Sequence, residues 1–143
     1  MRAPVSAMYE EVIDAAPSEI FRAWTEPAQL KQWFGPGGFQ TIEADVDLRV
    51  GGAYRIVMRT PDGAKLVITG TYHEIRPAER LVYTWAWAHV AEDEMRVTVE
   101  LHPVGRDRTR VVITHADIVD GELGRYESGW REGIARLRAL LKK

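Results

Sequence analysis

The chain has 143 residues, a length at which one domain buries about 70% of the surface that its unfolded chain exposes. A formal charge of -2 gives no basic excess for binding nucleic acid, and the absence of cysteine excludes disulfides, thiolate metal sites and cysteine nucleophiles. No apolar run has the length of a signal peptide or of the roughly 20 residues that cross a membrane, so we expect a single cytoplasmic domain over residues 1–143, with no membrane insertion.

The N-terminal part predicts one strand followed by two short helices. The loosely alternating segment 5–13 is typical of a strand. Pro17 suits the first turn of a helix, where its missing N–H costs nothing, and a second short helix begins around 25–27. The glycine-rich segment 35–38 ends it. The apolar positions of these two helices are Ile20, Phe21, Trp24, Leu30, Trp33 and Phe34.

From Thr41 the hydrophobic period is two, which is typical of antiparallel strands with one buried face. The first such strand extends to Val50, and Gly51-Gly52 predicts a two-residue hairpin turn. Gly70 lies inside the strand 65–75 and indicates a bulge or a close backbone contact. Further turns are predicted at 61–63, 76–79, 92–94 and 105–107, so neighbouring strands pair as an antiparallel meander.

The C-terminal segment predicts one long amphipathic helix, with Asp120 as a plausible N-cap. Its apolar stripe consists of Leu123, Tyr126, Trp130, Ile134, Leu137 and Leu141. Gly129 and Gly133 lie in the middle of this helix, and each costs about 1 kcal/mol of helix stability relative to alanine. Two explanations remain open: close packing against a neighbouring element, or clearance for a ligand.

This order of elements predicts a pocket. A twisted meander curls as twist accumulates, and a straight helix laid across its apolar face leaves a gap. Such gaps are where small-molecule sites form. The residues expected to line the gap and to contact a ligand are Tyr54, Met58, Tyr72, Trp85, Trp87, Val97, His115, Tyr126, Trp130 and Ile134, with Trp33 and Phe34 near its mouth.

The chain resembles the START-like, or SRPBCC, helix-grip superfamily, which includes polyketide cyclases and the birch-pollen allergen type. Within it, the chain is most similar to bacterial homologues of the activator of the heat-shock-protein-90 ATPase. The resemblance covers nearly the whole chain, in the segments AAPSEIF (15–21), WFGP (33–36), DLRVGG (47–52), GTYHEI (70–75), PAERLVYTW (77–85), TH (114–115) and GW (129–130). It implies an α+β fold in which a curved antiparallel sheet of six to seven strands wraps a long C-terminal helix, with two short helices after the first strand.

The members of this superfamily are hydrophobic-ligand carriers, cyclases and co-chaperone domains, and the fold alone does not choose among them. The leading hypothesis is non-catalytic binding of a small aromatic, polyketide-like or lipid-like molecule, with no cofactor or metal and with a monomer or homodimer as the assembly. The first alternative is a stress-linked co-chaperone that stimulates a chaperone ATPase. The eukaryotic co-chaperone carries an additional N-terminal domain, and this chain is expected to begin at its first strand.

The second alternative is an enzyme of cyclase or hydrolase type that uses the same pocket. His115 is its one suggestive inward-facing polar residue, because imidazole titrates near neutrality and can move protons. The competing interpretation is a core histidine that is satisfied by a backbone, Tyr or Trp partner. Metal binding is not expected, because His73, His89 and His102 share no short ligand spacing with each other or with His115.

Overall fold

The structure, a computed structural model, describes residues 5–119 and 121–142. Over these residues, seven strands form one antiparallel sheet in the order β1-β7-β6-β5-β4-β3-β2. In chain order the elements are β1 (Val5–Ile13), α1 (Pro17–Thr25), α2 (Pro27–Trp33), β2 (Gln40–Val46), β3 (Ala53–Arg59), β4 (Lys65–Arg76), β5 (Arg80–Trp87), a short 3₁₀ helix η1 (Ala88–Val90), β6 (Met95–Pro103), β7 (Thr109–Ile118) and α3 (Leu123–Leu141).

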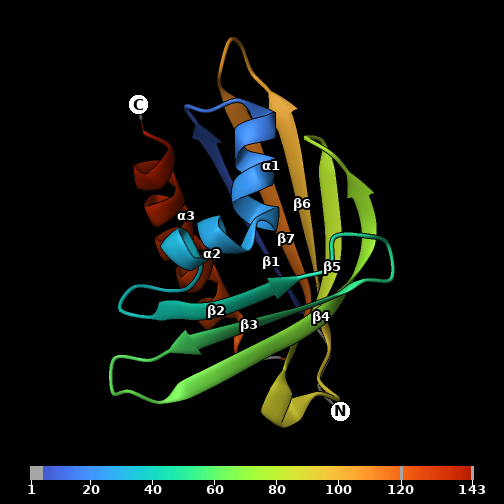
Figure 1. Cartoon of the computed structure of the whole chain (residues 1–143), viewed down its shortest axis with the longest axis vertical. Coiled ribbons are helices and arrows are strands. Elements are labelled where there is room, and N and C mark those ends of the chain that lie inside the picture. The colour runs from blue at the N-terminus through green and yellow to red at the C-terminus, as the bar shows by residue number, and fades with distance from the viewer. Residues whose placement is uncertain (1–4, 120, 143) are drawn as a thin grey trace.

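The sheet is strongly bent, so that β2 and β3 run nearly crosswise to β1, β6 and β7 (Figure 1). All strands from β2 to β7 pair with their neighbours in sequence, and β1 pairs with β7 at the far edge. The helix α3 crosses the concave side and buries Trp130, Ile134 and Leu137. The predicted architecture, an α+β fold with a curved sheet around a C-terminal helix, is confirmed.

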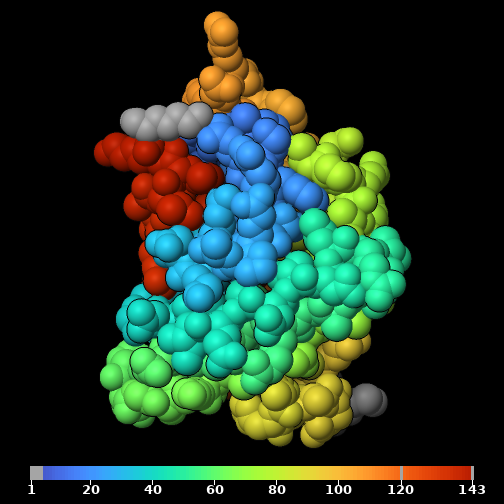
Figure 2. Space-filling model, viewed as in Figure 1, coloured from blue at the N-terminus to red at the C-terminus, as the bar shows by residue number. Residues whose placement is uncertain are grey.

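The two short helices close one end of the curved sheet. Both begin with proline in the first turn, as predicted, and α2 ends at Trp33 before the glycine-rich segment. In the space-filling view the α1–α2 segment packs directly against the neighbouring helix and strands (Figure 2). Trp24 of α1 stacks on Trp130 of α3 with ring centroids 5.9 Å apart, so this end of the core is filled by side chains.

The prediction for the strand that begins at Thr41 was wrong at its C-terminal end. β2 stops at Val46, and the connection to β3 spans 47–52 instead of two glycines. Leu48 and Val50, expected to face the core, are 43% and 66% exposed. The loop leaves the β2 ladder because it pairs with β4, where the Gly51 N–H donates to the Tyr72 carbonyl and the Tyr72 N–H donates to the Gly52 carbonyl.

Gly70 in β4 is a close backbone contact, one of the two predicted possibilities. A Cβ at this position would lie 2.0 Å from the Thr84 carbonyl oxygen and 2.6 Å from the Tyr54 ring. The Tyr54 ring occupies part of the space that a side chain would need, and its hydroxyl donates to that same carbonyl at 2.6 Å. The register shift in the β4–β5 ladder lies further along, between Tyr72 and Glu74.

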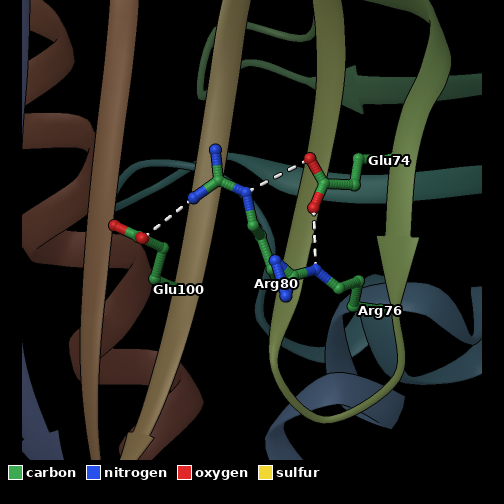
Figure 3. Close-up of polar contacts among 4 residues, drawn as sticks. All are labelled: Glu74, Arg76, Arg80 and Glu100. Atoms are coloured by element: carbon green, nitrogen blue, oxygen red, sulfur yellow. Dashed lines mark hydrogen bonds and ion pairs between the residues drawn. The ribbon is translucent and has the colours of Figure 1, made fainter.

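The opposite face of the sheet carries ion pairs. Arg80 contacts Glu74 and Glu100, and Arg76 also contacts Glu74, at N–O distances between 2.9 and 3.3 Å. The close-up shows these four side chains on the side of the strands away from α3 (Figure 3). The hydrogen bond from Arg76 lowers the pKa of Glu74. This face is therefore the polar side of the alternation that predicted the strands.

Among the described residues, no helix is long and apolar enough to cross a membrane. The predicted N-cap Asp120 lies outside the described residues, and α3 is preceded by Glu122 in the capping position.

Candidate functional site

A cavity of about 380 Å³ lies between α3, the loop that follows α2 and the strands β3 to β5. Seven of its lining residues are aromatic, and the loop contributes small residues where the sequence reads GPGG. The lining consists of Trp33, Phe34, Gly35, Pro36, Gly37, Phe39, Met58, Leu66, Trp85, Trp87, Arg125, Tyr126, Ser128, Gly129, Trp130, Glu132 and Gly133.

The structure brings seven of the twelve predicted ligand-contacting residues into this lining. They are Trp33, Phe34, Met58, Trp85, Trp87, Tyr126 and Trp130. Trp33 and Phe34 were expected at the mouth, but both side chains are almost fully buried and belong to the inner wall. The Trp33 indole N–H donates to the Ala23 carbonyl at 2.9 Å, which holds this ring against α1.

The other five predicted residues lie outside the lining. Tyr54 and Tyr72 face a separate void of about 10 Å³ near α1, and burial raises the pKa of both hydroxyls. Val97 and Ile134 are fully buried members of the core. Periodicity shows which face of a strand or helix a residue occupies, but not how far along that element the cavity lies. It therefore could not separate these core positions from the cavity lining.

His115 is a core histidine, completely buried, with both ring nitrogens occupied. The Trp130 indole N–H donates to its Nδ1 at 3.0 Å, so the proton of the neutral ring lies on Nε2, 3.2 Å from the Met95 sulfur. Burial lowers the pKa of His115 to about 3. A neutral ring without access to the cavity is not a proton shuttle, so the interpretation as a satisfied core residue is the one the geometry supports.

The loop that closes the cavity is fastened to α3 by two charged residues that lie outside the apolar stripe of this helix. Arg136 donates to the carbonyls of Gly35, Pro36 and Phe39 at 3.1 to 3.3 Å. Glu132 accepts the Gly37 N–H at 3.1 Å. The spacing of Glu132 and Arg136 puts both on one helix face, but nothing in the sequence shows which backbone that face meets.

The two helix glycines have different surroundings, and close packing holds for Gly133. A Cβ on Gly133 would lie 3.4 Å from the Gly35 carbonyl and 3.9 Å from the Trp33 ring, which is close packing. A Cβ on Gly129 would meet nothing within 4 Å, although Gly129 lines the cavity. Gly129 therefore leaves open space in the cavity wall.

A second cavity of about 360 Å³ lies beside the first, toward η1. Trp87 and Tyr126 line both cavities, and the Trp87 indole N–H donates to the Tyr126 hydroxyl at 2.8 Å. Both side chains are only partly buried, and burial is the main cause that raises the pKa of Tyr126. Leu66 and Arg125 also line both cavities, so the boundary between them consists of these four side chains and includes this hydrogen bond between the sheet and the helix.

The described residues contain no group of three or more metal-binding side chains, and the loop with His89, Glu92 and Asp93 is solvent-exposed. The charged side chains in the lining of the first cavity are engaged elsewhere: Glu132 holds the loop, and Arg125 pairs with Glu122 at 3.3 Å. The first cavity is therefore lined mainly by apolar side chains.

A comparison with protein families matches residues 14–142 to the family described as activator of Hsp90 ATPase homolog 1-like protein. The chain belongs to this family. The resemblance found in the sequence is thereby confirmed, and the match extends over residues 14–142. No curated protein matches the chain.

Solved structures of the same type superpose on nearly the whole chain. Protein CV1439 from Chromobacterium violaceum has a TM-score of 0.86 at 28% identity, covering 96% of this chain and 97% of that one. Protein NE0264 from Nitrosomonas europaea has a TM-score of 0.83 at 28% identity, covering 96% and 94%. The AHSA1 protein SPO3351 from Silicibacter pomeroyi has a TM-score of 0.83 at 28% identity, covering 96% and 97%.

Proposed function

We propose that this member of the family binds a small hydrophobic, ring-bearing molecule, without catalysis, in the cavity between α3 and the sheet. The observation that carries the proposal is the size and chemistry of this cavity. Its volume is about 380 Å³, and four tryptophans, a tyrosine and two phenylalanines are among its lining residues. An apolar cavity of about 150 Å³ is enough to bind benzene, so a bicyclic ring system fits this one.

The arrangement of polar groups supports binding in preference to chemistry. General acid–base catalysis needs a titrating group within hydrogen-bond reach of the reacting atom. His115, the candidate that the sequence suggested, lies behind the Trp85 ring at a centroid distance of 5.0 Å and has both nitrogens engaged. Rigid aromatic walls instead provide large contact area at little cost in side-chain entropy, which suits a carrier or sensor of flat molecules.

Naphthalene is the direct probe, because it is compact, flat and without polar atoms. Isothermal titration calorimetry should give saturable binding with one molecule per chain and a negative heat-capacity change. A thermal-unfolding series should agree, since a ligand at 100 times its Kd stabilises the folded state by about 2.7 kcal/mol. Naphthalene near its solubility limit that produces neither heat nor a change in melting temperature would overturn the proposal.

A further inference from the structure

The indole N–H of Trp85 is a buried donor that has no acceptor within the part of the chain that the structure describes. The chain has five tryptophans, and the other four donate to a protein atom: Trp24 to the Tyr83 hydroxyl, Trp33 to the Ala23 carbonyl, Trp87 to the Tyr126 hydroxyl and Trp130 to His115. The Trp85 side chain is 7% exposed, and its Nε1 has no partner among the described residues.

An unpaired donor in the core is destabilising, because the group has lost its hydrogen bonds to water and gained none. A phenylalanine at position 85 would supply an aromatic wall without that penalty. The indole N–H is therefore either satisfied by a molecule that enters the site or simply a cost to the fold. Its position favours the first, since Trp85 lines the cavity whose contents we propose to be an apolar ring.

The rings around Trp85 divide into a fixed set and a movable set. Trp130 and His115 are buried and hydrogen-bonded to each other, and Phe34 is 4% exposed. Trp87 and Tyr126 contact the Trp85 ring edge-on, at centroid distances of 5.7 and 6.2 Å, and both are only partly buried. These two rings line both cavities, together with Leu66 and Arg125, so each of them borders free space, and one mutual hydrogen bond joins them.

We infer that the ligand carries a hydrogen-bond acceptor oxygen, such as a ketone, on its ring system, and that the Trp85 indole N–H binds this oxygen after Trp87 and Tyr126 move apart. This inference rests on the proposed function and narrows it from any apolar ring to a carbonyl-bearing aromatic. A site that presents a buried donor binds analogues that lack the acceptor more weakly, because the donor then stays unpaired.

The test compares two probes of nearly equal shape, 2-acetylnaphthalene and 2-isopropenylnaphthalene, which differ in a carbonyl oxygen against a methylene group. Their affinities are measured by calorimetry on the wild type, on Trp85→Phe and on Trp24→Phe. The Trp24 variant is the matched control, because Trp24 is a buried indole outside the cavity lining and already has an acceptor. The ratio of the two affinities cancels effects of each substitution that are common to both probes.

We expect the preference for the ketone to fall about tenfold in Trp85→Phe, the worth of one neutral hydrogen bond, and to persist in Trp24→Phe. An unchanged preference in Trp85→Phe, with both probes still bound, would overturn the inference and leave the proposed function standing. Failure of both probes and of naphthalene to bind the wild type would overturn both.

A measurement on the wild type alone guards against a variant that does not fold. The measurement is a proton–nitrogen correlation spectrum in which the indole signal of Trp85 has been assigned. The ketone should move the Trp85 indole proton downfield relative to its position in the isopropenylnaphthalene complex. The indole signals of Trp24, Trp33 and Trp130 serve as internal references, since their donors stay engaged within the protein. The Trp87 signal is not a reference, because its hydrogen bond to Tyr126 breaks when the two rings move apart. Equal shifts with both probes would contradict the inference.

Discussion

Gly129→Leu should stabilise the protein and weaken ligand binding at the same time. The position is helical and lines the cavity, and a Cβ added there would meet no atom within 4 Å. Replacing glycine in a helix gains about 0.8 kcal/mol in helix propensity. A leucine side chain that packs into the cavity adds about 1.5 kcal/mol of apolar burial, so the free energy of unfolding should rise by about 2 kcal/mol in total.

The same leucine takes the space of the ligand. Each lost methylene-sized contact costs about 0.8 kcal/mol, so two such contacts reduce naphthalene affinity by more than about tenfold. Gly124→Leu is the control: Gly124 belongs to the same helix, is exposed, would also have open space around an added Cβ and lies outside the lining. It should gain only the propensity contribution and bind naphthalene as the wild type does.

Two measurements decide this prediction: urea unfolding for the stability of each variant, and calorimetry for its naphthalene affinity. Undiminished naphthalene affinity in a folded Gly129→Leu protein would refute the reasoning, because the ligand would then occupy some other site. A loss of affinity of equal size in Gly124→Leu would also refute it, since a change in the helix itself, and not the filled cavity, would be responsible.

Three further predictions concern the elements around the cavity. Unfolded His115 gains a proton near pH 6.5, whereas folded His115 gains one only near pH 3. Acidification between these two values should therefore lower the free energy of unfolding by about 1.4 kcal/mol per pH unit. His115→Gln should remove this part of the pH dependence in urea titrations at successive pH values. Gly70→Ala should lower the free energy of unfolding by at least about 2 kcal/mol, since its Cβ has no space beside the Thr84 carbonyl; a loss below half that value would mean that β4 shifts easily. Arg136→Gln should lower the free energy of unfolding by about 1.5 kcal/mol and speed amide hydrogen exchange in residues 34–39, because three hydrogen bonds to the loop are lost. Unchanged exchange there would show that the loop does not depend on this guanidinium.

The sequence determined the elements because local patterns are sufficient for them. A period of two predicted the strands, Pro17 and Pro27 began the two short helices, and the apolar stripe from Leu123 to Leu141 predicted α3. Gly70 signalled a close approach, since only a residue without a side chain fits against the Thr84 carbonyl. The one error in extent, at 47–50, arose because the loop pairs with β4, a contact that the alternation of Leu48 and Val50 does not show.

Tertiary structure alone decided which inward-facing residues share a cavity. Trp85 and Val97 both face the core of the sheet, yet only Trp85 reaches the open space, because sheet curvature and the path of α3 set the height at which the gap remains. Hydrogen-bond partners were equally beyond the sequence. Folding brings the Trp130 indole within reach of His115, and Arg136 within reach of the loop that it anchors, across long stretches of chain. It leaves the Trp85 indole without an acceptor among the residues described.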